Sequence, residues 1–243
     1  MPDIHFMHAG LRFSISVEKF LTDNCGFRYS VHYQKDQNSE LNGLCERYGS
    51  DKGELTSTGH PYPWPSHNYA DLYEGLFGHC RDAVRTVFEC GLGTNNPDLP
   101  SSMGASGRPG ASLRVWRDYF PNAHVYGADI DRNTLFQEER ISTYYVDQTS
   151  AESVAAMWRQ VPVETFDFMI DDGLHTYQAG VTLFENSFHK LRKGGIYAIE
   201  DITPPAMISF RSYFGQRGHR VEFVDLTTPP PGTTDNAMIL IRK

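Results

Sequence analysis

Two carboxylates and a histidine follow a short apolar run in the segment FDFMIDDGLHTYQAG, residues 166–180. The run from Phe166 to Ile170 is typical of a strand that is covered on both faces of a sheet. Asp171, Asp172 and His175 come directly after it. In an open parallel sheet, the carboxyl ends of the strands form the edge where ligands bind. The segment therefore predicts an active site at the end of a buried strand.

The segment VFECGLG, residues 87–93, reads as a strand that carries Glu89 near its end and is followed by Gly91 and Gly93. Glycine at such a turn lets the backbone approach a bound ligand closely. The next predicted strand ends at Asp129, where an acidic residue is expected to accept hydrogen bonds from a ribose. The pattern predicts a cofactor that contains a nucleoside.

Asp147 and Gln148 follow the third predicted strand, where their side chains can bind an adenine amino group. For Asp147, a role in a turn or as a helix cap is an equally good explanation. A dinucleotide normally requires a third glycine that opens a helix directly after the first strand. ECGLGTNN does not continue into a helix, and Glu89 would repel a phosphate. These features favour a nucleoside cofactor without phosphate, and S-adenosylmethionine is the common one.

Short apolar runs alternate with amphipathic stretches from Val84 onward, which predicts an α/β fold of repeated βα units. The seven predicted strands are 84–89, 124–128, 141–146, 166–170, 195–199, 220–225 and 236–242. The predicted helices are 68–77, 112–120, 132–139, 150–160, 177–192 and 205–217. TTPPPGTTD joins the last two strands without a helix, so we expect a terminal antiparallel hairpin.

Residues 44–243 are expected to form one domain and residues 1–43 an N-terminal extension, with a strand or helix around Phe13 to Leu21. The extension has no clear hydrophobic periodicity. Its role is either to cap the domain or to form a homo-oligomer contact. The long segment 94–111, rich in Gly, Pro and Ser, separates the first strand from its helix. A loop of that length is usually functional or mobile, and a lid is one such function.

The composition argues against several classes of protein. With a net charge of −8 and no Lys/Arg run, the chain lacks the basic surface of a nucleic-acid binder. Neither a secretion signal nor an apolar stretch of about 18 residues is found, so we expect a cytoplasmic protein without a membrane span. The four cysteines have no CxxC spacing, which argues against a zinc site or a disulfide framework.

The order of ECGLG, Asp129, the DD pair and the terminal hairpin resembles the Rossmann-like class I S-adenosylmethionine-dependent methyltransferases. RYGSDKG, GASLRVWRDYFPNAHVYGADID, DDGLH and GGIYAIEDI resemble more narrowly the metal-dependent sugar O-methyltransferases of antibiotic biosynthesis, such as those of the mycinamicin, macrocin and calicheamicin pathways. The resemblance covers residues 44–243. It implies that Asp172, Glu200 and Asp201 bind magnesium and that His175 is the general base.

Elementary chemistry agrees with this set. Magnesium prefers hard oxygen ligands, and three carboxylates converging without a cation would repel one another. The alternative is that one or two of them cap helices. Full proton transfer from an aliphatic hydroxyl to histidine in water costs roughly 12 kcal/mol, because their pKa values are about 15.7 and about 6.5. A metal that lowers the hydroxyl pKa makes the histidine an adequate base.

Three further residues are assigned to the cofactor. Asp171 is expected to face its methionine end, although either aspartate of the pair could exchange roles with the other. Lys52 and Tyr69 lie in a segment dense in aromatic and charged residues, where lining the site and supporting the fold are equally good explanations.

The sequence thus predicts a magnesium-dependent O-methyltransferase that transfers a methyl group from S-adenosylmethionine to a deoxysugar hydroxyl. The sugar would belong to a natural-product glycoside or a nucleotide sugar. The alternatives are a catechol-type or other small-molecule O-methyltransferase, an NAD-dependent oxidoreductase, and a degenerate methyltransferase fold that serves as a binding partner. The acceptor and its hydroxyl position are not specified by the sequence.

Overall fold

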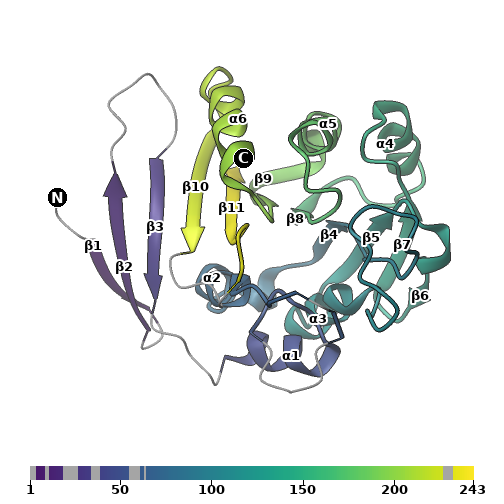
Figure 1. Cartoon of the computed structure of the whole chain (residues 1–243), viewed down its shortest axis with the longest axis horizontal. Helices are drawn as coiled ribbons and strands as arrows, with labels where there is room; N and C mark the ends of the chain where they lie inside the picture. Colours follow the sequence, from purple (N-terminus) through teal and green to yellow (C-terminus); the bar gives the residue numbers. More distant parts are fainter. Residues whose placement is uncertain are drawn as a thin grey trace.

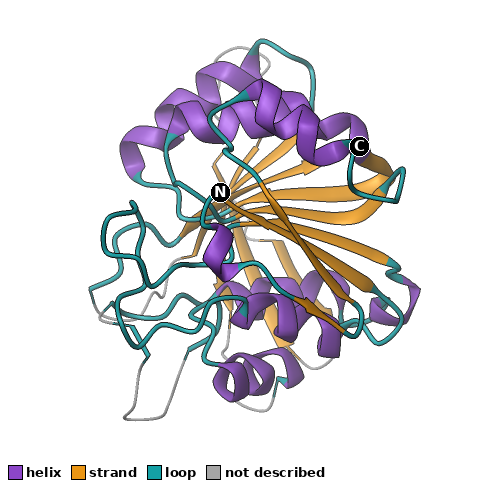
Figure 2. Cartoon of the chain, turned by 90° about the vertical axis from the view of Figure 1, so that its right-hand side faces the viewer, coloured by secondary structure: helices purple, strands orange, loops and turns teal. Residues whose placement is uncertain are grey.

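The computed structural model describes residues 39–54, 61–62, 64–226 and 232–243 with side chains, and the backbone of three strands at 4–8, 11–18 and 27–33. Residues 19–21 of the first predicted element and 227–231 of the hairpin connection lie outside this set. The predicted α/β fold is confirmed, because helices cover both faces of one sheet (Figures 1 and 2). Among the described residues, no helix is long and apolar enough to cross a membrane.

The predicted strands all form. Five of them pair in parallel: β4 (Thr86–Cys90), β5 (His124–Asp129), β7 (Ile141–Tyr145), β8 (Phe166–Asp171) and β9 (Leu191–Ile199). The last two form the expected antiparallel hairpin, which pairs with β9: β10 (Arg220–Leu226) and β11 (Ala237–Arg242). The apolar runs of these strands are buried between two helical layers, which is why the sequence pattern identified them.

The described part of the chain has four strands beyond the predicted seven. The complete order in the sheet is β1-β2-β3-β10-β11-β9-β8-β4-β5-β7-β6. At one edge β6 (Gln137–Glu138) pairs with β7, and at the other edge β3 (Phe27–Tyr33) runs parallel to β10. Beyond β3 lie β2 (Leu11–Glu18) and β1 (Ile4–His8), on the left in Figure 1. The predicted element near residue 13 is therefore a strand.

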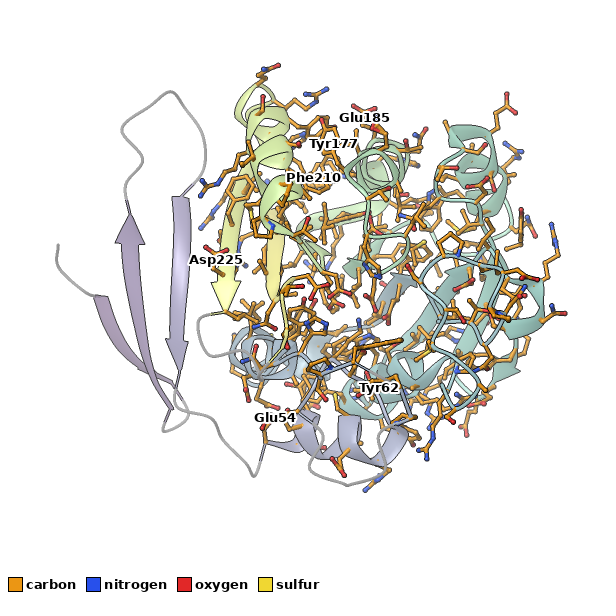
Figure 3. The ribbon with its side chains drawn as sticks, in the orientation of Figure 1. Glu54, Tyr62, Tyr177, Glu185, Phe210 and Asp225 are labelled. Carbon is orange, nitrogen blue, oxygen red and sulfur yellow. The ribbon has the colours of Figure 1, made fainter. Side chains whose placement is uncertain are left out.

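In the described part of the chain, three α-helices pack on each face of the sheet. One layer contains α1 (Glu40–Tyr48), α2 (Tyr69–Phe77) and α3 (Ala111–Tyr119). The other contains α4 (Ala151–Trp158), α5 (Tyr177–Ser187) and α6 (Pro204–Gly215). In the second layer the rings of Tyr177 and Phe210, with centroids 5.1 Å apart, join α5 to α6 (Figure 3).

One predicted helix, 132–139, is wrong. Residues 132–134 form a short 3₁₀ turn, and residues 137–138 form β6. The hydroxyl of Thr143 accepts a hydrogen bond from the amide of Phe136 and donates one to its carbonyl, both at 2.6 Å. These bonds tie Phe136 to β7 and leave its backbone groups unavailable to a helix.

The helix α1 was not predicted, and the expected boundary between residues 43 and 44 falls inside it. The side chain of Ser39 caps this helix by accepting a hydrogen bond from the amide of Asn42. The division of the chain into an extension and a domain remains a prediction.

The chain reverses its direction across the sheet beside β4. From β4 it proceeds to β5 and β7 on one side, and then crosses to β8 and β9 on the other. Such a reversal splays the loops apart at the carboxyl ends of the strands and creates a crevice for ligands. The candidate residues 89–93, 129, 147–148, 171–175 and 200–201 all follow or end these strands.

Candidate active site

A cavity of about 520 Å³ opens at the carboxyl ends of β4, β5, β7 and β8. Eight of the predicted site residues line it: Gly91, Gly93, Asp129, Asp147, Gln148, Asp172, His175 and Asp201. Five others do not: Lys52, Tyr69, Glu89, Asp171 and Glu200. The structure therefore divides the predicted set into residues that reach the cavity and residues that lie behind its wall.

Asp129 is held in place at one side of the cavity by two backbone amides. Its Oδ2 accepts a hydrogen bond from Leu92 at 2.7 Å, and its Oδ1 accepts one from Asp131 at 2.8 Å. Burial raises the pKa of Asp129 above its ordinary value. Each carboxylate oxygen can accept a further hydrogen bond, so Asp129 can bind a pair of hydroxyl groups.

Gly91 and Gly93 have positive φ angles of 101° and 79°. A Cβ atom at Gly91 would lie 2.0 Å from the carbonyl oxygen of Asp172, and one at Gly93 would lie 2.1 Å from the sulfur of Met103. Close packing inside the protein is therefore sufficient to require glycine at both positions. Met103 belongs to the long loop, which folds back so that residues 100–103 line the cavity.

Asp171 supports the cavity wall instead of facing the ligand space. Its Oδ1 accepts a hydrogen bond from Gln148 Nε2 at 3.0 Å, and Gln148 Oε1 accepts one from the amide of Leu174 at 2.7 Å. Burial raises the pKa of Asp171 to about 6. The amide of Gln148 is therefore engaged with the protein on both sides.

The turn alternative for Asp147 has direct support. Its Oδ1 accepts hydrogen bonds from the amide of Thr149 at 3.0 Å and from the Thr149 hydroxyl at 2.6 Å. Asp147 nevertheless lines the cavity, so these two bonds do not remove it from contact with a ligand.

Lys52 lies behind the wall, 2% exposed, and contacts three carboxylates. Its Nζ lies 2.6 Å from Asp172 Oδ2 and 3.2 Å from Glu89 Oε1, and it also contacts Glu200 Oε2. Burial acts to lower the pKa of Lys52, but the carboxylates of Asp172 and Glu200 outweigh it and hold this pKa well above its ordinary value. Lys52 is therefore a permanent buried cation that joins the ends of β4, β8 and β9.

The two glutamates beside Lys52 are also bound by aromatic donors. Tyr73 donates a hydrogen bond to Glu200 Oε1 at 2.5 Å, and the indole of Trp116 donates one to Glu89 Oε2 at 2.6 Å. Burial raises the pKa of Glu200 and of Glu89 despite the opposing effect of Lys52. In this arrangement neither glutamate directs its carboxylate into the cavity.

Asp201 is the centre of a second cluster that does face the cavity. Tyr69 donates a hydrogen bond to its Oδ1 at 2.7 Å, and His67 Nε2 lies 3.4 Å from the same oxygen. His175 Nδ1 lies 3.5 Å from Oδ2. Ligand atoms of Asp172, His175 and Asp201 lie within 4.8 Å of one another, a spacing that permits them to share one metal ion.

The backbone at this cluster is strained, because His175 and Asp201 both have a φ of 56°. Burial acts to lower the pKa of His175, but the carboxylates of Asp201 and Asp172 outweigh it, so this pKa is raised. A cation bound by these carboxylates would instead lower the pKa of His175.

Several cavity residues were not assigned from the sequence. Thr94 lines the cavity, and its hydroxyl donates a hydrogen bond at 2.5 Å to Oδ2 of Asp131, which does not itself line the cavity. Trp64 and Asp235 line the other side, and the Asp235 carbonyl accepts a hydrogen bond from Tyr69 at 3.1 Å. These residues belong to loops whose positions have no signal in the strand and helix pattern.

No protein-family model matches the chain. It is 36% identical over 162 residues to 8-demethyl-8-alpha-L-rhamnosyl tetracenomycin-C 2'-O-methyltransferase of Streptomyces olivaceus, covering 67% of this chain and 37% of the relative. Mycinamicin VI 2''-O-methyltransferase of Micromonospora griseorubida is 33% identical over 159 residues, covering 63% and 37%. L-olivosyl-oleandolide 3-O-methyltransferase of Streptomyces antibioticus is 32% identical over 219 residues, covering 86% and 46%. The chain spans less than half the length of each.

The solved structures similar to this chain include the MycE methyltransferase of the mycinamycin pathway. MycE in complex with Mg, SAH and mycinamycin VI matches with a TM-score of 0.53 and 31% identity, over 68% of this chain and 40% of MycE. MycE with Mg and SAH alone matches with a TM-score of 0.58 over 84% of this chain and 54% of that one, at an identity of 24% that shows the fold only. The resemblance seen in the sequence is thereby confirmed: this chain is a homologue of the sugar O-methyltransferases of antibiotic biosynthesis and has their Rossmann-like methyltransferase fold.

Proposed function

We propose that this chain transfers a methyl group from S-adenosylmethionine to a hydroxyl of a sugar in a natural-product glycoside, with magnesium and with His175 as the base. The observation that carries the proposal is the single cavity that gathers Asp129, the two glycines and the Asp172–His175–Asp201 cluster. The three relatives are named as glycoside O-methyltransferases, which supports a glycoside acceptor over a catechol.

The charge of the cavity favours a cationic cofactor. Among the described residues that line it, Arg108 is the one lysine or arginine. The same described lining contains six aspartates: Asp51, Asp129, Asp147, Asp172, Asp201 and Asp235. A pyrophosphate would be repelled there, whereas the sulfonium of S-adenosylmethionine would be attracted. The same charge disfavours NAD as a cofactor and a nucleotide sugar as an acceptor. Asp129 would bind the ribose.

Asp172 and Asp201 would hold the magnesium ion. Their side chains are 21% and 16% exposed, both line the cavity, and carboxylate oxygens are the donors that magnesium prefers. Glu200 would have to release Lys52 or Tyr73 to join them, so its place in the ligand set remains a prediction. When bound, the metal would lower the pKa of an acceptor hydroxyl.

His175 would remove the proton of that hydroxyl. Its Nδ1 is the ring nitrogen near Asp201, which leaves Nε2 for the acceptor proton, and Asp201 would stabilise the imidazolium that forms. As the proton leaves, the sugar oxygen forms a bond to the methyl carbon and the carbon–sulfur bond breaks. The electron pair of that bond stays on sulfur, so the products are the methyl ether and neutral S-adenosylhomocysteine.

Calorimetry with S-adenosylhomocysteine and with NAD tests the cofactor. We expect saturable binding of the former, weakened at least about tenfold by Asp129→Ala because hydrogen bonds to the ribose are lost. Asp167→Asn, at the opposite edge of the sheet, is the matched control and should leave binding unchanged. Binding of NAD without binding of S-adenosylhomocysteine would show that the chain is not a methyltransferase.

A further inference from the structure

Trp64 presents a fixed aromatic surface to the cavity. Its indole N–H donates a hydrogen bond to Asp51 Oδ2 at 2.8 Å. Its ring stacks on that of Tyr62, with centroids 5.2 Å apart and an interplanar angle of 20° (Tyr62 is labelled in Figure 3). Tyr62 itself is buried. Two contacts therefore hold the indole in one orientation while Trp64 remains a lining residue of the cavity.

Trp64 is connected to the reactive cluster by a short chain of contacts. The Asp51 carbonyl, on the residue that binds the indole, accepts a hydrogen bond from the amide of His67 at 2.7 Å. The ring of His67 stacks on Tyr69 and lies 3.4 Å from Asp201. Trp64 and Asp51 therefore belong to the side of the cavity where Asp201 lies. The predicted nucleoside contacts lie elsewhere: Asp129 ends β5 and Asp147 follows β7.

The other two tryptophans of the chain have structural positions. Trp116 is 1% exposed and donates to Glu89, and Trp158 is 6% exposed and donates to Ser187 at 3.0 Å. Neither lines the cavity. Trp64 is therefore the tryptophan whose indole is available to a ligand in this cavity.

We propose that Trp64 is the platform on which the sugar ring of the acceptor packs, with Asp51 accepting a hydrogen bond from a sugar hydroxyl. A pyranose has an apolar face of C–H bonds and a rim of hydroxyl groups, which match a flat indole with a carboxylate beside it. Asp51 Oδ2 is used by the indole, and Oδ1 makes no hydrogen bond with the described residues. The ligand class is an uncharged pyranoside. This assignment rests on the proposed function and adds the residues that select the acceptor.

Tryptophan fluorescence tests the platform directly. Methyl α-L-rhamnopyranoside is titrated into the protein in the presence of S-adenosylhomocysteine and magnesium. We expect a saturable change in emission, which disappears in Trp64→Phe because the reporter is removed and persists in Trp158→Phe, the matched control. Calorimetry should show that Trp64→Phe keeps the affinity for the sugar within about threefold, whereas Trp64→Ala weakens it at least about tenfold.

Three results would overturn the proposal: no saturable binding of the sugar, an emission change that survives Trp64→Phe, or wild-type sugar affinity in Trp64→Ala. Measuring S-adenosylhomocysteine binding and methyl transfer on the same samples separates this proposal from the proposed function. Sugar binding at Trp64 without methyl transfer would refute the enzyme assignment alone. Methyl transfer with an unchanged acceptor KM in Trp64→Ala would refute the platform alone.

Discussion

The two ends of β8 carry aspartates with opposite electrostatics. Asp167, at the start of the strand, accepts hydrogen bonds from the amides of Arg85 at 2.7 Å and Thr86 at 2.9 Å and pairs with Arg192. Burial acts to raise the pKa of Asp167, but these donors outweigh it and the pKa is lowered. Asp171, four residues later, has a pKa raised to about 6 by burial. Aspartate is therefore stabilised as an anion at the amino edge of the sheet, whereas burial destabilises its charged form at the carboxyl edge.

Backbone strain follows the same division. Four described residues other than glycine have a positive φ: Ser101, Arg140, His175 and Asp201. Three of them line the cavity, and Arg140 alone precedes a strand at the opposite edge. Strain and like charge that cost stability collect where a ligand can relieve them or use them. At the amino edge the Asp167 carboxylate is fully matched by donors and a cation, whereas the carboxyl edge gathers carboxylates and strained residues around the cavity.

The largest difference between substitutions at the two edges of the sheet is expected in kcat. His175→Ala should lower kcat by about 10²–10⁴-fold, because the proton of the acceptor hydroxyl loses its base. The affinity for S-adenosylhomocysteine should change little. The matched control is His124→Ala at the opposite edge, where the ring contacts Ser142 at 2.9 Å, and its kcat should stay close to that of the wild type. Equal losses in both variants would remove the distinction between the edges.

A large effect on stability is expected at the buried cation. Lys52→Met leaves the carboxylates of Glu89, Asp172 and Glu200 without their counter-charge, so the free energy of unfolding should fall by about 3–5 kcal/mol. Urea denaturation measures this change. Adding Glu200→Gln should recover part of the loss, because one of the unpaired charges is removed. Lys193→Met, at an exposed position, is the control and should cost less than about 0.5 kcal/mol. A similarly small cost for Lys52→Met would contradict the account.

A smaller effect is expected at the amino edge. Asp167→Asn should lower the free energy of unfolding by about 1–3 kcal/mol at pH 7, because the amides of Arg85 and Thr86 lose a charged acceptor. The folded pKa of Asp167 is lowered, so its stabilisation is complete above the unfolded pKa of about 3.9 and disappears as the pH falls through the folded value. Denaturation curves of both proteins should therefore converge in acid. A difference that does not shrink as the pH falls below the unfolded pKa of about 3.9 would show that charge is not the cause.

The fold was largely predictable because its strands are continuous apolar runs buried on both faces. The pattern failed where a tertiary contact decides local structure. Residues 132–139 form a turn and a strand, and not the predicted helix, because Thr143 binds the backbone of Phe136. The helix α1 begins at the Ser39 cap, and no periodic apolar pattern predicts it. Of the three strands near the N-terminus, β3 pairs with β10, which is distant in the sequence, and β2 and β1 follow it in the sheet.

The site was predictable to the extent that it depends on strand ends. Asp129, Asp172 and Asp201 meet in one cavity because parallel strands bring their carboxyl ends together. Side-chain direction was not predictable: Glu89 points to Trp116 behind the wall, as successive residues of a strand point to opposite faces. The pairing of Lys52 with Glu200 joins residues 148 positions apart, which no local pattern encodes.

Methyl transfer with and without magnesium tests the central claim most directly. The protein is stripped of metal with a chelator and supplied with S-adenosylmethionine and either 8-demethyl-8-alpha-L-rhamnosyl tetracenomycin C or mycinamicin VI, the acceptors in the names of two relatives. We predict a methylated glycoside only after magnesium is restored, and none with Asp172→Asn. Undiminished transfer in the chelator, or no transfer to either glycoside by protein that binds S-adenosylhomocysteine and magnesium, would contradict the account.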